Sequence, residues 1–398
     1  MKSTNKTIGL VIPAPIGYSE TFFTSKVKGL EEAGFKVIIF CARNNDADAS
    51  FKYRYQWVLS AKPVIRVLQV FFGLPMLLKC PSRGSRYIRY ARQSGQSIGS
   101  IIRGLYNNGN ILTGPRLDTL HFGFTTMGHG REVIGKAMNC KLSTSFRGYD
   151  IGVYPLKHGL GCYHKLWKHL DKVHTISDDL LEIAYERLAL PTNIRVKKIT
   201  PAIDTKKFVG REKRQFIRTD KLKILSIGRL HWKKGHEYAL KALKELKEAG
   251  INFQYDIVGS GKDLERIIFT KTKLGLESEV NVCEEVSHSD VPELMKSHDI
   301  LLHPSVQEGF GNTVLEAQAA GMLCIVSDAE GLAENVLHEK TGWVVPKRNS
   351  AMIARQLLEI LNMPQDELLQ ISKMAQNRVL NQYDLEAQKS AFTQFFNA

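Results

Sequence analysis

The sequence predicts an α/β protein of two doubly wound domains, each with a parallel sheet that carries helices on both faces. The chain has 398 residues, which exceeds the size at which one hydrophobic core usually stops growing. Apolar, strand-like runs alternate with amphipathic, helix-like segments along both halves, and this alternation is typical of parallel sheets. The predicted domains span residues 1–205 and 206–384, and a last helix, 385–398, is expected to pack back on the first domain.

In the first half, a strand at Ile8–Ile12 leads through a turn-rich loop to a helix at about 20–33. Further strands are expected at 36–40, 119–122, 141–146, 172–176 and 195–199. The same order restarts after a charged stretch near 204–221, with strands at 221–228, 253–259, 280–284, 299–305, 322–328 and 342–346 and helices at 237–249, 262–274, 291–296, 313–320 and 352–361. Open parallel sheets bind ligands at the carboxyl ends of their strands, so two facing domains of this kind would enclose a cleft. One substrate on each side of the cleft is the arrangement that a transferase needs for the group donor and the group acceptor.

The basic residues are unevenly distributed. Of a net charge of +15, residues 1–205 hold 29 Lys and Arg against 14 Asp and Glu, whereas residues 206–398 hold 26 of each. Residues 51–120 carry 11 basic residues and one acid, which indicates an anionic partner for the first half. The six cysteines lack metal-ligand spacing, and neither a signal peptide nor an 18-residue apolar stretch is recognised, so we expect a cytoplasmic protein.

The most informative segment is HPSVQEGFGNTVLEAQAAGMLCIVSD, residues 303–328. A strand ends in a glycine-bearing loop that includes Phe310, and a helix of good helix formers follows directly. Gly309 and Gly311 let the backbone approach a ligand. The free amides at the helix start favour an anion, and they belong to Asn312, Thr313 and Val314. The segment therefore predicts a diphosphate site.

Four charged residues surround this predicted site. Glu308 precedes the loop and Glu316 lies one turn into the helix. A diphosphate repels carboxylates, so we expect Glu308 to accept hydrogen bonds from sugar hydroxyls and Glu316 from ribose hydroxyls; taken alone, each is equally well a solvated surface residue. In SIGRLHWKKG (226–235), Arg229 and Lys234 follow another strand end, where cations can stabilise the charge of a leaving diphosphate.

The sequence resembles the signature of glycosyltransferase family 4, whose fold is GT-B. The resemblance is carried by Arg229 and Lys234, and by the pair Glu308 and Glu316 with its spacing of seven intervening residues. The resemblance covers residues 221–346 nearly throughout, including Gly259 in DIVGSGKD (256–263) and the segment EKTGWVVP (339–346). The first domain is similar more loosely, through PAPIGYSETFF (13–23), LHFGF (120–124) and SFRGYDI (145–151). These three segments resemble the branch that builds colanic-acid-type exopolysaccharides and surface glycans.

The resemblance implies a retaining enzyme that takes a UDP- or GDP-sugar and usually needs neither a metal nor another cofactor. It implies that Glu308 contacts the donor sugar, Glu316 the ribose, and Arg229 and Lys234 the diphosphate, with the nucleobase near Val286. The implied acceptor is a glycan, or a glycan linked to polyprenyl diphosphate, in surface polysaccharide or lipopolysaccharide biosynthesis.

One residue departs from the family pattern, because Arg147 stands where many relatives have a histidine beside the donor sugar. An arginine cannot act as a base at neutral pH, so we expect Arg147 to bind a phosphate or carboxylate. His121 and Asp150 then remain as candidates near the reacting centre, with Asp150 orienting the acceptor hydroxyl, although His121 is equally well a buried strand-end histidine. Gly17, in the first strand–helix loop, would let the acceptor or a phosphate approach.

Residues 64–93, VIRVLQVFFGLPMLLKCPSRGSRYIRYARQ, mix a strongly apolar run with arginines. This composition favours adsorption to an anionic leaflet, and we expect residues 51–120 to bring the protein to the inner face of the cell membrane. If the apolar run belongs to the core, the arginines are only a solvated surface. Nucleic acid is not an expected partner, since no nucleic-acid-binding module is recognised.

Two other classes of protein compete with a glycosyltransferase. A nicotinamide dehydrogenase would carry GxGxxG after the first strand, and the stretch Pro13–Ser19 has a single glycine, which excludes that class. A non-catalytic nucleotide-sugar- or glycan-binding protein of the same fold stays open, although the presence of all four charged donor-site residues favours an enzyme.

Overall fold

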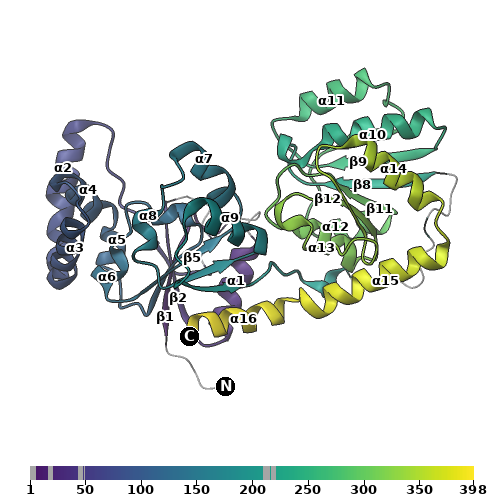
Figure 1. Cartoon of the computed structure of the whole chain (residues 1–398). Helices are drawn as coiled ribbons and strands as arrows, with labels where there is room; N and C mark the ends of the chain where they lie inside the picture. The colour runs from purple at the N-terminus through teal and green to yellow at the C-terminus, as the bar shows by residue number, and fades with distance from the viewer. Residues whose placement is uncertain (1–5, 17–20, 44–47, 49, 209–215, 217–220) are drawn as a thin grey trace. The chain divides into compact units, whose positions relative to one another are not determined.

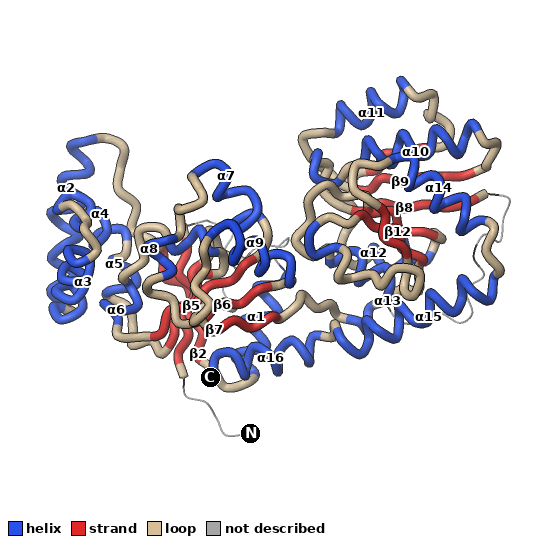
Figure 2. Tube along the Cα trace, in the orientation of Figure 1, coloured by secondary structure: helices blue, strands red, loops and turns tan. Residues whose placement is uncertain are grey.

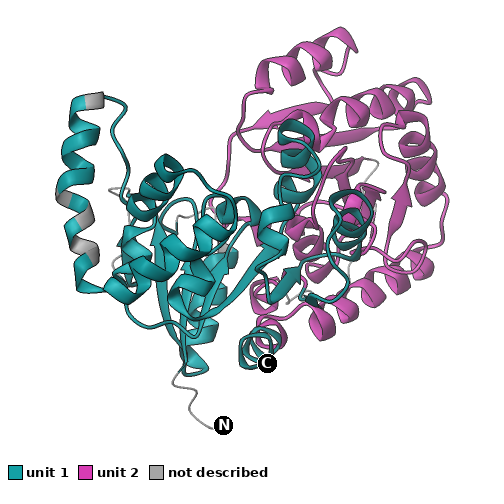
Figure 3. Ribbon diagram, turned by 60° about the vertical axis from the view of Figure 1, so that its left-hand side comes forward, with its two compact units in different colours: residues 1–199, 389–398 teal, residues 200–388 magenta. Residues whose placement is uncertain are grey.

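The structure is a computed structural model that describes residues 6–16, 21–43, 48, 50–208, 216 and 221–398. The chain forms two compact units (Figures 1 and 3). Unit 1 contains residues 1–199 and 389–398, and unit 2 contains residues 200–388. The boundary in the structure thus lies a few residues before the one expected from the sequence, and each unit has its own parallel sheet.

The sheet of unit 1 has seven described strands in the order β3-β2-β1-β4-β5-β6-β7, all parallel. From β1 the strand order runs outward through β2 to β3, and β4 then lies on the other side of β1. The topological switch point of this sheet is therefore between β1 and β4. The strands are β1 (Thr7–Val11), β2 (Lys36–Cys41), β3 (Tyr53–Tyr55), β4 (Thr119–Phe122), β5 (Lys141–Phe146), β6 (Lys172–Thr175) and β7 (Arg195–Lys198). The expected strands are present, and β3 is an additional one.

Helices cover this sheet on both faces (Figure 2). They are α1 (Thr21–Glu32), α2 (Pro63–Gly73), α3 (Pro81–Gln93), α4 (Ile98–Asn107), α5 (Gly109–Leu112), α6 (Ile134–Met138), α7 (Tyr154–His158), α8 (His164–Trp167) and α9 (Asp178–Leu188). Local sequence explains where α9 begins. Ser177 caps this helix by accepting a hydrogen bond from the Leu180 amide, and Asp178 and Asp179 complement the helix dipole in the first turn.

Residues 63–107, for which only an apolar and basic region was predicted, contain the helices α2, α3 and α4. Helix α3 contacts both α4 and α6, and Figure 1 shows α2, α3 and α4 together at one side of unit 1. In the described part of the chain, no helix is both long and apolar enough to cross a membrane.

The C-terminal helix, α16 (Leu385–Asn397), belongs to unit 1 from residue 389 onward. Its side chains Phe392, Phe395 and Phe396 are buried in one hydrophobic cluster with residues of β1, β2 and α1. Lys172 and Lys141 donate hydrogen bonds to the backbone carbonyls of Phe395 and Ala398. Cations at this end of a helix are favourable because the helix dipole is negative there.

The sheet of unit 2 has six described strands in the order β10-β9-β8-β11-β12-β13, again all parallel. The strands are β8 (Leu222–Ile227), β9 (Phe253–Val258), β10 (Val280–Cys283), β11 (Ile300–His303), β12 (Leu323–Ser327) and β13 (Trp343–Val345). The topological switch point of this sheet is between β8 and β11, which are neighbours in the sheet.

The helices of unit 2 are α10 (His236–Glu248), α11 (Leu264–Lys273), α12 (Val291–Lys296), α13 (Asn312–Ala319), α14 (Ser350–Leu361) and α15 (Gln365–Gln382). Helix α10 packs on α14, and α13 packs on α15. The elements expected from the sequence are present within a few residues, and α15 is the long helix that was not predicted.

Candidate active site

The candidate active site lies in unit 2, where β8 and β11 end side by side. Ligands of doubly wound folds bind at such a topological switch point. The loop after β8 and the loop after β11 are held together, since the Val306 amide donates to the Lys233 carbonyl at 2.6 Å. Gly235 has φ 68°, and a β-carbon there would lie 2.1 Å from the carbonyl oxygen of Pro304. Glycine at this position therefore allows the two loops to meet.

Three polar side chains converge between these loops. Lys234, from the short helix η5 (Trp232–Lys234), forms an ion pair with Glu308. His303, the last residue of β11, places Nε2 3.3 Å from the same carboxylate oxygen, Oε2. Oε1 of Glu308 is therefore the oxygen left to accept bonds from a ligand.

The charge state of Glu308 follows from these contacts. Burial acts to raise the pKa of Glu308, but Lys234 and His303 outweigh burial and hold the pKa well below its ordinary value. The backbone amide of Glu308 donates to the Glu330 carboxylate at 2.7 Å, which fixes the loop. Glu308 is thus ionised throughout the physiological range and is held in position before any ligand binds.

The loop after β11 ends at Gly311, which has φ 85°, and α13 begins at Asn312. The amides of Asn312 and Thr313 have no acceptor among the described residues, as expected for a helix start that binds an anion. The prediction for Val314 is wrong, because its amide already donates to the Gly311 carbonyl at 3.1 Å.

Gly309 and Phe310 occupy the same loop with different exposure. Gly309 is partly exposed. Phe310 is 2% exposed, and its ring packs against Tyr383 with the centroids 5.9 Å apart. The side chain of Phe310 therefore supports the loop from the core, and only its backbone is available for the donor contact that the sequence predicts.

Glu316 lies in the next turn of α13 and is partly buried. Its carboxylate accepts no hydrogen bond from the described residues. Burial raises the pKa of Glu316 to about 7, against a smaller opposing effect of Lys207. A carboxylate in this state gains strongly from hydroxyl donors, which is the role that the sequence assigns to Glu316.

The remaining predicted donor residues lie at the same edge of the sheet. Arg229 follows β8 and is exposed, with no carboxylate partner among the described residues. Gly259, after β9, has φ 149°, and a β-carbon there would lie 2.1 Å from the Gly228 carbonyl oxygen. Val286 lies just after β10 and is partly buried. No cluster of three His, Cys, Asp or Glu side chains suited to a metal ion occurs within the described ranges.

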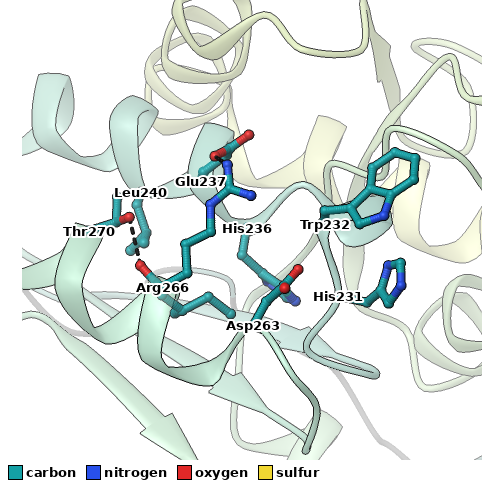
Figure 4. A pocket seen from close by; sticks show the side chains of 9 residues that line it. His231, Trp232, His236, Glu237, Leu240, Asp263, Arg266 and Thr270 are labelled. Carbon is teal, nitrogen blue, oxygen red and sulfur yellow. Dashed lines mark hydrogen bonds and ion pairs between the residues drawn. The ribbon is translucent and has the colours of Figure 1, made fainter.

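A pocket beside η5 was not predicted from the sequence (Figure 4). His236, the first residue of α10, is 5% exposed, and neither ring nitrogen has a partner in the described part of the chain. Burial, then Lys234 and His303, lower the pKa of His236 to about 3, so its ring is neutral. Figure 4 shows Asp263 next to His236 and the exposed Trp232 at the other side of the pocket.

In unit 1, the structure contradicts a place for His121 near the reacting centre and agrees with the alternative of a buried strand-end histidine. The side chain lies in β4 and is 0% exposed. Its nitrogens lie 2.8 Å from the hydroxyls of Ser143 and Ser145 and from the Lys26 amine, and two rings of α16 pack against it. Burial and the charge of Lys26 hold the pKa of His121 well below its ordinary value. His121 is a neutral core histidine in this structure, because the sheet and α16 enclose it.

Asp150 and Arg147 lie in the loop after β5. Asp150 is 0% exposed, and its carboxylate accepts hydrogen bonds from the Thr125 and Arg147 amides at 3.0 Å each. This geometry contradicts an acceptor-orienting role, since the carboxylate is enclosed and holds the loop. Arg147 donates from Nε to the Gly123 carbonyl at 3.1 Å and stacks on Phe22; its binding of a phosphate or carboxylate stays a prediction. Gly17 lies outside the described residues.

Three residues of the unit 2 site were missed. His303 contacts Glu308, Glu330 accepts from the Glu308 amide, and Asn335 donates to the Gly311 carbonyl at 3.2 Å. The position of His303 at a strand end, five residues before Glu308, could have indicated that its side chain lies near this carboxylate. Glu330 and Asn335 come from the segment after β12, and only the folded loop brings them to the site.

Comparisons with known proteins agree with this fold and with a glycosyltransferase. Residues 211–378 match the family described as Glycosyl transferases group 1. The chain is 27% identical over 388 residues to the putative colanic acid biosynthesis glycosyltransferase WcaL of Escherichia coli K12, covering 92% of this chain and 93% of that protein. It is 25% identical to the Escherichia coli UDP-Gal:alpha-D-GlcNAc-diphosphoundecaprenol alpha-1,3-galactosyltransferase, covering 49% of this chain and 50% of that protein.

Among solved structures, the crystal structure of Anabaena Alr3699/HepE in complex with UDP is similar, with a TM-score of 0.71 and 14% identity over 98% of this chain and 99% of that chain. The two parallel-sheet units therefore define a GT-B fold. The protein is an enzyme of the glycosyltransferase class, with a match to the Glycosyl transferases group 1 family over residues 211–378.

Proposed function

We propose that the protein is a retaining glycosyltransferase of family 4 that transfers a sugar from a UDP- or GDP-sugar to a glycan or lipid-linked glycan. The observation that carries this proposal is the cluster of Lys234, Glu308 and His303 beside the start of α13. The names of the similar proteins support the class of pathway, since they include colanic acid biosynthesis and a diphosphoundecaprenol-linked acceptor. We therefore infer a role in surface polysaccharide or lipopolysaccharide biosynthesis.

The donor would lie across the carboxyl ends of β8 and β11. Its diphosphate would accept hydrogen bonds from the amides of Asn312 and Thr313 and face the positive end of the α13 dipole. Arg229 and Lys234 would supply the cations, Oε1 of Glu308 would accept from the sugar, and Glu316 would accept from the ribose. The nucleobase would contact the backbone near Val286.

In the proposed reaction, the bond between the sugar carbon C1 and the phosphate oxygen breaks, and the leaving diphosphate takes the bonding electron pair. The acceptor oxygen forms its bond to C1 on the same face, so the configuration is retained. The leaving phosphate oxygen takes the acceptor proton, and no protein base is required. Arg229, Lys234 and the α13 amides stabilise the charge that develops on the diphosphate, and we expect the reaction to need neither a metal nor a cofactor.

The first experiment is to test a panel of UDP- and GDP-sugars for binding, then for donor hydrolysis and transfer. We expect one donor to bind with chelator present and to be hydrolysed slowly. Glu316→Ala should weaken donor binding by roughly ten- to a hundredfold, as expected for loss of charge-assisted hydrogen bonds. Strict metal dependence, or binding that is equal in wild type and Glu316→Ala, would contradict these roles. Binding without hydrolysis or transfer would favour a non-catalytic protein.

We also propose that the helices within 51–120 bring the enzyme to an anionic membrane surface at the inner face of the cell membrane. Val64, Val67, Leu68 and Phe71 lie at helical spacing on α2 and are 50% to 73% exposed. Such a stripe on a basic segment is typical of interfacial helices. Two of the arginines in α3 are already used, because Arg83 and Arg86 donate to backbone carbonyls.

Sedimentation with vesicles tests the membrane proposal. Wild-type protein should bind vesicles that contain phosphatidylserine more strongly than neutral ones, and Phe71→Ser combined with Arg89→Gln and Arg92→Gln should reduce this binding several-fold. Phe269→Ser in α11 is the matched control, since Phe269 is 67% exposed and Phe71 is 70% exposed. Equal loss in both variants, or no loss in either, would contradict a specific role of α2 and α3.

A further inference from the structure

Unit 1 contains a large cavity at the amino ends of β4, β5 and β6. Asp118, Lys141 and Asp171, which lie at or directly before the starts of these strands, line it together with residues of α3 and α6. Its volume is about 590 Å³, within the ~300–1,000 Å³ that is typical of small-molecule sites. Substrates of doubly wound folds bind at the opposite, carboxyl edge, so a ligand here would be neither the donor nor the acceptor.

Positive side chains line this cavity from several elements. They are Arg86 and Arg89 of α3, Arg116 before β4, Lys136 of α6 and Lys141 of β5. All but Arg86 are exposed, so their charged groups are accessible to a ligand. None of the five forms an ion pair with a carboxylate within the described ranges. Nε of Arg86 donates to the Ala137 carbonyl at 2.9 Å, which holds this guanidinium beside the cavity.

The two carboxylates that line the same cavity do not pair with these cations. Asp118 accepts a hydrogen bond from the Thr7 amide, and Asp171 accepts one from the Leu142 amide, at 2.7 Å each. Both carboxylates are thus held by the backbone of neighbouring strands. His169 adds no charge at pH 7, because burial and neighbouring lysines lower its pKa. The lining therefore carries five positive charges against two negative ones.

A buried lysine at the same edge of the sheet responds to this excess of positive charge. Burial is the main reason that the pKa of Lys172 is lowered to about 8. The positive charges of Lys141, Arg195 and Lys6 lower it further, against a smaller opposing effect of Asp171. Like charges that are brought together in this way repel one another, and a bound anion would relieve the repulsion.

We propose that this cavity binds a small polyanion with two or more phosphate groups, held by the two arginines of α3 together with Arg116 and Lys136. Phosphate oxygens accept several charge-assisted hydrogen bonds, and arginine can donate to them in pairs. A single phosphate would leave most of these cations unpaired. The cavity contains none of the residues assigned to the donor or the acceptor, so the inference goes beyond the transferase function and does not depend on it. A soluble polyphosphate ester and a lipid headgroup with two phosphates share this chemistry.

Calorimetry on the full chain tests this proposal with tripolyphosphate and inorganic phosphate as probes. We expect tripolyphosphate to bind at least tenfold more tightly than inorganic phosphate. Arg116→Gln combined with Lys136→Gln should weaken its binding by roughly ten- to a hundredfold. Arg187→Gln combined with Lys157→Gln is the matched control, because it removes the same charge from exposed positions of unit 1 outside the cavity, and it should leave the affinity unchanged.

Two further measurements separate recognition from folding and from general charge. Both double variants should unfold within about 2 °C of the wild type, because exposed charges contribute little to stability. Arg116→Lys combined with Lys136→Arg keeps the charge and should retain binding within about threefold. The proposal is overturned if the wild type binds no tripolyphosphate, or if the two charge-removing variants lose it equally, which would show non-specific attraction to the net charge.

Lys234→Ala separates this cavity from the proposed donor site. Its binding of tripolyphosphate should equal that of the wild type, and loss of binding in this variant alone would place the probe in unit 2 and defeat the proposal. A wild type that binds no nucleotide-sugar would defeat the proposed function and leave the inference about the cavity intact.

Vesicles that contain cardiolipin, whose headgroup carries two phosphates, identify the source of the ligand. If tripolyphosphate releases the wild type from them more effectively than sodium chloride of equal ionic strength, and the variant of Arg116 and Lys136 binds them weakly, the cavity accepts a lipid headgroup. If vesicle binding is unchanged by tripolyphosphate and by this variant, while tripolyphosphate still binds in calorimetry, the ligand is a soluble phosphate ester.

Discussion

Donor affinity should rise about tenfold between pH 6 and pH 8 because of Glu316. The pKa of this carboxyl is raised to about 7 by burial, so about a tenth of it is ionised at pH 6 and about nine tenths at pH 8. The ionised form accepts charge-assisted hydrogen bonds on both oxygens, whereas the protonated carboxyl uses one oxygen as a donor. The apparent dissociation constant scales with the inverse of the competent fraction, which gives the tenfold change.

The assay is calorimetric titration with an intact nucleotide-sugar, since the terminal phosphate of free UDP would itself titrate near pH 6. Glu308 stays ionised over this range because Lys234 and His303 lower its pKa more than burial raises it. Glu316→Gln is the control and should bind weakly with little dependence on pH. A wild-type affinity that is equal at both pH values, or the same slope in Glu316→Gln, would refute the reasoning.

The raised pKa of Glu316 affects stability in the opposite direction, because the free energy of unfolding falls over the pH range in which donor affinity rises. The pKa of Glu316 is higher in the folded protein than in the unfolded chain, so its contribution to stability is fully present below about pH 4.5 and is lost as pH rises through about 7. The loss amounts to at most roughly 3 kcal/mol. Glu316→Gln should therefore unfold at a higher temperature than the wild type at pH 8 and at nearly the same temperature below pH 5.

Three further variants test separate parts of the structure. Lys234→Ala should lower turnover by roughly a hundredfold or more and raise the pKa of Glu308, which kinetics over a range of pH would detect. Deletion of residues 389–398 should destabilise unit 1 severely, because it removes three buried phenylalanines, and circular dichroism on heating would show it. Asp299→Ala removes the carboxylate that accepts the Lys223 amide at 3.0 Å. It should lower stability by about 1–3 kcal/mol without changing the donor affinity.

Much of the fold could be predicted because its signals are local. Apolar runs bounded by glycine predicted the strands of unit 2, and the glycine-bearing loop before α13 predicted the start of that helix to within one residue. For His121 the sequence left two alternatives open, and the choice between them depends on serines of a neighbouring strand and on the docking of α16.

Polar groups are paired differently at the amino and carboxyl edges of the sheets. At the amino edges, an aspartate stands directly before β4, β6 and β11 and accepts the first or second amide of the neighbouring strand. Asp118 accepts from Thr7, and Asp171 accepts from Leu142, at 2.7 Å each; Asp299 does the same in unit 2. These carboxylates satisfy backbone groups that would otherwise be orphaned, so they serve stability.

At the carboxyl edges, by contrast, some partly or fully buried polar side chains have no hydrogen-bond partner in the described structure, although burial without a partner is unfavourable. Glu316 has a raised pKa and no donor among the described residues, and neither ring nitrogen of the buried His236 has a partner there. A structure selected for stability alone would pair or replace such groups. Glu316 lies beside the ends of β8 and β11, the edge where doubly wound folds bind ligands, and the hydroxyl groups of the proposed nucleotide-sugar would supply its missing donors.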